Sequence, residues 1–112
     1  MIERTDVKKL VNFSKEEHTK VIFYDKGNIK AQIMCLQSGQ LIPPCKMQND
    51  VLFYVIEGEG EIIIDSEKEA LKKGVCVVVP RFAESRSISA KSDLVILAIQ
   101  AKSLNRLTER LP

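Results

Sequence analysis

Histidine is almost absent from this sequence: among 112 residues, His18 is the only one. The three cysteines, Cys35, Cys45 and Cys76, form no CxxC pair, so neither a disulfide framework nor a zinc knuckle is indicated. No apolar stretch approaches the roughly 18 residues of a membrane span, and charges interrupt the N-terminal segment where a signal peptide needs an apolar core. These absences predict reduced thiols, no membrane association and a cytoplasmic location.

Charge of one sign is also missing. The 17 basic and 15 acidic residues give a net charge of +2 and form no long run of one sign, so no nucleic-acid partner is expected. Hydrophobic residues make up 45% and charged residues 29%, as in ordinary soluble globular proteins. A chain of this length can bury its own core. We therefore expect one domain over residues 1–112, with its core at about 20–100.

What the sequence does contain is a series of short apolar segments, rich in β-branched and aromatic residues and closed by turn signals. Residues 21–24 and 29–36 resemble a hairpin around Gly27. Pro43 and Pro44 cannot donate to a sheet ladder, which places their segment at an edge or a bend. The pattern predicts an all-β barrel of about eight or nine strands. Further strands are expected at residues 51–56, 75–79, 85–89 and 94–99.

The two ends of the chain give weaker signals. Residues 1–19 form an N-terminal extension in which Leu10, Val11 and Phe13 suit an edge strand, while residues 14–17 suit a turn or one helical turn. Residues 102–112 are expected to form a short C-terminal helix that begins after Ser103 and covers one end of the barrel. Its apolar face would carry Leu104, Leu107 and Leu111.

Two segments resemble the signatures of the cupin superfamily. Residues 39–58 keep the spacing of the first signature, G-x5-H-x-H-x3-4-E-x6-G, from Gly39 to Gly58. Residues 74–89 keep the frame of the second, G-x5-P-x-G-x2-H-x3-N, through Gly74 and Pro80. The resemblance implies a small, single-domain conserved barrel of the cupin-2 type, a double-stranded β-helix or jelly roll. It also implies a homodimer, for which exposed edge strands give a physical motive.

The resemblance further implies a divalent iron, manganese, nickel or zinc ion held by histidines at positions 45, 47 and 85 and a glutamate at position 51. This sequence has Cys45, Met47, Val51 and Ser85 there. Such ions prefer imidazole and carboxylate ligands, so neither a conventional metal site nor a cofactor is expected. His18 precedes the barrel core and is expected on the surface.

The sulfur atoms at this place allow three interpretations. Cys45 and Met47 alternate on a strand and therefore face one side, a pairing that suits Cu(I). Buried cysteine and methionine also commonly fill cores, and we favour this interpretation. A reactive thiol at Cys45 is the weakest, because Lys46 should point to the opposite face and no histidine is near in sequence.

Strand alternation predicts which side chains line the barrel interior. Its mostly apolar wall would leave a small-molecule site or a filled core, and the pattern does not distinguish the two. The predicted ligand-binding residues are Cys45, Met47, Val51, Phe53 and Val55 on one face, with Ser85 and Ser87, and also Ser89, as polar contacts from a facing strand. The basic residues near the second signature are instead expected on a solvated surface of mixed charge. They are Lys72, Lys73, Arg81, Arg86 and Lys91.

Two hypotheses of function follow. The first is a non-catalytic small-molecule-binding or accessory module without the usual metal site. The alternative is an enzyme acting on a small organic substrate, either a metal-dependent oxygenase or isomerase with soft or atypical ligands, or a metal-free catalyst. Whether the protein is an enzyme depends on what positions 45, 47, 51 and 85 surround.

Overall fold

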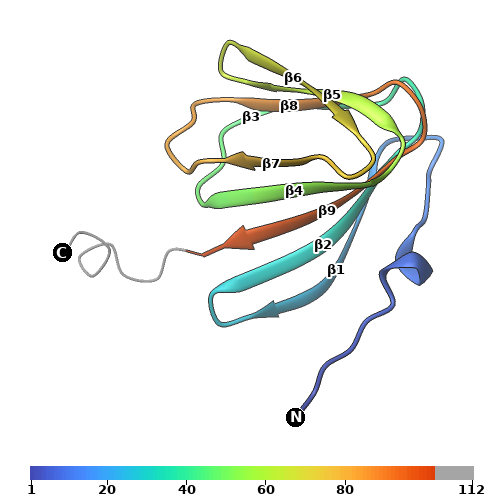
Figure 1. The fold of residues 1–112 in the computed structure, drawn as a ribbon, viewed down its shortest axis with the longest axis vertical. Helices are drawn as coiled ribbons and strands as arrows, with labels where there is room; N and C mark the ends of the chain where they lie inside the picture. Colours follow the sequence, from blue (N-terminus) through green and yellow to red (C-terminus); the bar gives the residue numbers. More distant parts are fainter. Residues whose placement is uncertain (103–112) are drawn as a thin grey trace.

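The structure, a computed structural model, describes residues 1–102. In this part of the chain nine strands form two antiparallel sheets that face each other (Figure 1). One sheet has the order β1-β2-β9-β4-β7 and the other the order β3-β8-β5-β6. The predicted all-β class and strand number are confirmed. The strands are β1 (Thr19–Lys26), β2 (Ile29–Leu36), β3 (Leu41–Cys45), β4 (Asp50–Glu57), β5 (Glu59–Ile64), β6 (Glu67–Lys72), β7 (Cys76–Val79), β8 (Arg86–Ala90) and β9 (Leu94–Ala101).

The main core lies between the sheets, where alternate residues of each strand point inward. Val55 of β4 is opposite Ile96 of β9, and Ile62 of β5 is opposite Ile88 of β8; all four side chains are fully buried. One end of this interior, which we call the closed end, is filled by apolar side chains. They are Leu36, Val55, Leu71, Ala90 and Leu94.

A tight backbone approach seals the closed end. Gly58 joins β4 to β5 with a φ of +89°, and a Cβ added there would lie 2.0 Å from the carbonyl oxygen of Asp93. Only glycine suits both the positive φ and the missing space. This turn therefore fixes the β4–β5 connection against the start of β9.

The N-terminal extension lies outside the barrel beside β1 (Figure 1). It contains a 3-10 helix, η1 (Val7–Leu10), whose N-cap Asp6 accepts a hydrogen bond from the Lys8 amide. Leu10 and Phe13 pack on the outward-facing Ile33, Cys35 and Val95 of the five-stranded sheet. The expected edge strand near Leu10 is therefore replaced by a cover over the outer face.

The edge position predicted for the prolines is confirmed, because β3 is the outermost strand of its sheet and its register shifts between Ile42 and Cys45. The expected C-terminal helix lies outside the described residues. Within residues 1–102, no helix is long and apolar enough to cross a membrane.

Candidate functional site

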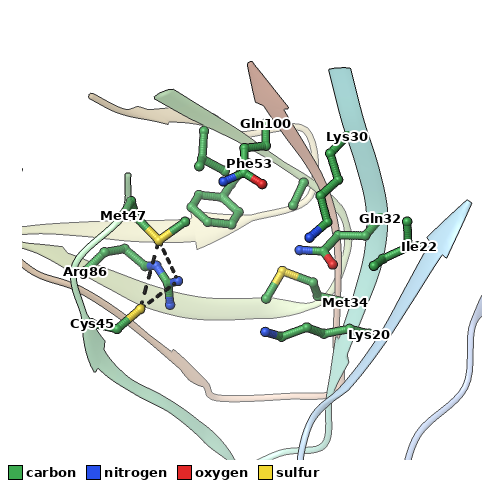
Figure 2. Close-up of a pocket in the computed structure, with 12 residues that line it drawn as sticks. Lys20, Ile22, Lys30, Gln32, Met34, Cys45, Met47, Phe53, Arg86 and Gln100 are labelled. Atoms are coloured by element: carbon green, nitrogen blue, oxygen red, sulfur yellow. Dashed lines mark hydrogen bonds between the residues drawn. The ribbon is translucent and has the colours of Figure 1, made fainter. Parts of the chain in front are cut away.

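A cavity of about 500 Å³ opens into the interior at the end opposite the closed end. We call this the open end. Its walls come from β1, β2, β9 and β4 on one side and from β3, β8 and the loop after β3 on the other (Figure 2). The lining residues are Lys20, Ile22, Lys30, Gln32, Met34, Cys45, Met47, Val51, Phe53, Arg86, Ala98 and Gln100.

Strand register explains how residues distant in sequence meet in this wall. Gln32 is opposite Ile22 on one side and Ala98 on the other, and Ala98 is in turn opposite Phe53. The next row toward the open end contains Lys30 and Gln100. Because directly opposed side chains share a face, each row crosses three or four strands and projects into the cavity. Along β2 the inward positions change from apolar Met34 to polar Gln32 and Lys30 toward the open end.

Arg86 is the most unusual residue of the cavity wall. Its side chain is only 5% exposed, and its Nη2 lies 3.2 Å from Sγ of Cys45 and 3.0 Å from Sδ of Met47 (Figure 2). Its guanidinium carbon lies 5.6 Å from the centre of the Phe53 ring, within cation–π range. Within the described residues, the buried Nε and Nη1 have no hydrogen-bond partner.

Burial makes this charge costly. Desolvation lowers the pKa of Arg86, and the neighbouring Cys45 opposes that shift. The ordinary pKa of a guanidinium is so high that the side chain stays a cation at neutral pH. Sulfur is a weak acceptor, and each buried donor left unsatisfied costs about 1–3 kcal/mol. The protein thus maintains an undercompensated positive charge at the cavity wall.

Two lysines face Arg86 from the opposite wall. The side chains of Lys20, Lys30 and Gln32 point from β1 and β2 into the space that Arg86 reaches from β8 (Figure 2). No lining residue in the described part of the chain is acidic. The charged side chains that line the cavity are therefore all positive.

His18 lies just before β1 and is partly buried. Desolvation lowers its pKa, and the positive charges of Lys20 and Arg86 lower it further, while Glu17 raises it. The positive charges of the cavity therefore influence the protonation of His18, although His18 does not line the cavity.

The structure brings four of the seven predicted site residues together. Cys45, Met47, Val51 and Phe53 line the cavity, with Cys45 exposed at its mouth and Phe53 buried. Val55 faces the same interior but lies in the closed end, where it is fully buried.

Ser85 and Ser87 do not line the cavity. Ser85 is held outside by the turn after β5, since its amide donates to Oδ1 of Asp65 and its carbonyl accepts from the Asp65 amide. Ser87 is opposite Ile63, a partly exposed residue on the outer face of β5. The inward positions of β8 are therefore offset by one residue from the predicted ones, and Arg86 and Ile88 face the interior instead.

The basic residues near the second signature separate in the same way. Arg81 and Lys73 form exposed ion pairs with Asp50 and Glu57, as expected for a surface of mixed charge. Lys72 and Lys91 are also exposed. Arg86 alone among the five is buried, which contradicts its expected surface position.

The donor set does not fit the metal that the resemblance implies. The Cys45 and Met47 sulfurs lie 4.0 Å apart, but the Arg86 guanidinium is within hydrogen-bond distance of both and would repel a metal cation. Val51 offers no donor atom, and Ser85 lies elsewhere. Within residues 1–102, no group of three or more histidine, cysteine, aspartate or glutamate side chains is placed to hold a metal ion.

Sequence reasoning missed the polar wall of the site. Lys20, Lys30, Gln32 and Gln100 carry no motif, and only cross-strand register brings them to one cavity. A signal was present in β2, where inward positions change along the strand from Lys30 and Gln32 to the apolar Met34.

The fold and the open cavity define an antiparallel double-sheet barrel with an internal site. The sequence model of the cupin domain matches residues 32–99, so the chain belongs to the cupin domain family. No protein of curated function matches the sequence significantly.

Solved structures agree with this assignment. Protein TT1209 from Thermus thermophilus is 21% identical, with a TM-score of 0.83 over 90% of this chain and 98% of that one. An RmlC-like cupin protein from Desulfovibrio desulfuricans is 20% identical, with a TM-score of 0.80 over 90% and 97%. A cupin 2 conserved barrel domain protein from Leptotrichia buccalis is 24% identical, with a TM-score of 0.77 over 85% and 46%. At these identities the likeness shows the fold alone.

Proposed function

We propose that this protein is a small-molecule-binding module that holds its ligand in the cavity at the open end of the barrel. The observation that carries this proposal is the cavity itself. Its volume of about 500 Å³ falls in the usual range of ligand sites. Its walls combine apolar Met34, Val51, Phe53 and Ala98 with a few convergent polar groups, which is the common composition of such sites.

Arg86 favours a binding module over the metal-dependent oxygenase or isomerase. A soft metal cation would have to bind at the Cys45 and Met47 sulfurs, where the Arg86 guanidinium already lies. Two positive charges repel each other strongly in a site of low dielectric. The donor set therefore supports a site for organic ligands, without a bound metal.

Filling the cavity tests the proposal. Ala98 is buried in the cavity wall on β9, whereas Ala101 on the same strand is exposed and does not line it. Native mass spectrometry of the purified protein and a thermal-shift screen of small metabolites should detect binding to the wild type and to Ala101→Leu. Binding should be lost in Ala98→Leu, because the larger side chain enters the cavity. Equal binding by both variants, or an empty barrel that no compound stabilises, would refute the proposal.

A further inference from the structure

The ligand of this cavity can be described by its charge. Arg86 presents a cation from β8, with two buried nitrogens that no described residue satisfies. A buried charge without a counter-ion is costly, so it is normally retained where something outside the protein compensates it. Cys45 and Met47 hold Nη2 only through weak sulfur acceptors. An oxygen anion is a stronger acceptor than either sulfur, so an anion in the cavity would compete with Cys45 and Met47 for this guanidinium.

Lys20 and Lys30 provide a second positive region across the cavity, with the amide of Gln32 beside them (Figure 2). No ion pair involving either lysine occurs among residues 1–102. The acidic residue opposite Lys30 in register is Asp25, whose carboxylate is engaged by Lys102. His18, which lies close to Lys20, is neutral or positive and therefore supplies no counter-charge.

We infer that the cavity binds a small organic dianion whose negative charge lies between Arg86 on one wall and Lys20 and Lys30 on the other, with an apolar body against Phe53 and Met34. This inference rests on the proposed function and adds the ligand's chemical class. Dicarboxylates and phosphate monoesters share this chemistry. Arginine suits either group, because its planar fork matches carboxylate and phosphate oxygens.

Calorimetric titration with a defined panel tests the inference. Succinate, phthalate and phenyl phosphate are the dianions, and succinamide and phthalamide are neutral compounds of similar shape. At least one dianion should bind about tenfold or more tightly than the neutral compounds, and its affinity should fall as salt is added. Tightest binding of phenyl phosphate would assign a phosphate monoester, and tightest binding of a dicarboxylate would assign that class.

Three variants locate the binding. Arg86→Met should weaken dianion binding about 10- to 100-fold, as expected for loss of a charged hydrogen bond. Lys20→Gln keeps the fold in any event, since Lys20 is exposed, and should weaken binding by a smaller factor. Lys91→Gln removes an exposed charge that does not line the cavity, so it should leave binding unchanged.

Thiol alkylation by iodoacetamide gives an independent readout of position. Cys45 is exposed at the cavity and Cys76 is exposed on β7, away from it. A bound dianion should slow alkylation of Cys45 and leave that of Cys76 unchanged.

The failure of this inference differs from failure of the proposed function. Neutral compounds that bind as tightly as the dianions, or a co-purified neutral ligand, would overturn the dianion and keep the binding module. Unchanged affinity in both Arg86→Met and Lys20→Gln would also overturn the inference. If no panel compound binds, the dianion is refuted, and the metabolite screen on Ala98→Leu decides the proposed function separately.

Discussion

The two ends of this barrel share strands β2, β4, β8 and β9 but differ in the side chains that these strands place inside. At the closed end Leu36, Leu71 and Leu94 are almost completely buried. At the open end the interior contains Arg86, with Lys20 and Lys30 across the cavity. The pairing of β2 with β9 has no register shift from one end to the other, so along these strands the backbone does not cause the difference. It comes from which side chains occupy the inward positions.

This contrast separates stability from binding. Apolar burial at the closed end supplies folding free energy, whereas the buried charge at the open end costs it. Natural proteins commonly retain such local costs where function requires them. The comparison therefore predicts opposite effects for substitutions at the two ends.

The largest effect should come from the closed end. Leu94→Ala removes a fully buried side chain and should lower the free energy of unfolding by about 3 to 5 kcal/mol in urea titrations. The same substitution at Leu41, which is 54% exposed, should cost less than about 1 kcal/mol. Similar losses at both positions would remove the distinction between a packed end and an exterior strand.

The Gly58 turn gives the next effect. Gly58 and Gly74 share a φ of +89°, but a Cβ at Gly74 meets nothing within 4 Å. Both alanine substitutions carry the cost of positive φ, and Gly58→Ala adds the clash with Asp93. Its loss of stability should exceed that of Gly74→Ala by about 2 kcal/mol. Equal losses would show that backbone conformation alone matters at this turn.

Arg86→Met should act in the opposite direction to the closed-end substitutions. Without ligand, it should raise the free energy of unfolding by about 1 to 3 kcal/mol, because it removes a buried, undercompensated charge and keeps an apolar side chain. Arg81→Met, at an exposed ion pair, should change stability by less than about 1 kcal/mol. A loss of several kcal/mol in Arg86→Met would mean that the guanidinium stabilises the fold.

The smallest effect concerns pH. Burial and nearby cations lower the pKa of His18 in the folded protein, so the unfolded chain binds the proton more readily. Stability should therefore be complete above the ordinary histidine pKa of about 6.5 and decline as the pH falls through that value toward the folded pKa. His18→Gln should flatten this part of the stability–pH curve. If the stability–pH curve of His18→Gln has the same slope as that of the wild type, the positive charges near the cavity do not govern the protonation of His18.

Much of the fold was predictable because it depends on local patterns. The apolar runs and turn glycines indicated the strands, and alternation from Val51 to Phe53 correctly indicated the inward side of β4. The interior of β8 was wrong by one residue, because its start after the loop at Phe82 has no periodic signal. The phase of β8 is set by the contact of Ser85 with Asp65 and by the pairing of β8 with β5. Arg86 is buried because this phase gives it an inward position.

The charged half of the site depends on long-range pairing. Lys20 and Arg86 are far apart in sequence, and their cavity forms only after β1 and β2 join β9 and the sheet faces β8. Hydropathy assigns such residues to the surface, since lysine and arginine are rarely buried. No local feature of the sequence could overrule that expectation.

The most direct test of the account is a backbone amide NMR titration of the wild-type protein with whichever panel dianion binds most tightly. Chemical-shift changes should concentrate at the open end, at Gln32, Ala98 and Arg86, and leave Leu71 and Leu94 of the closed end unchanged. Changes confined to the outer surface, or spread equally over both ends, would contradict the claim that the open end is the binding site.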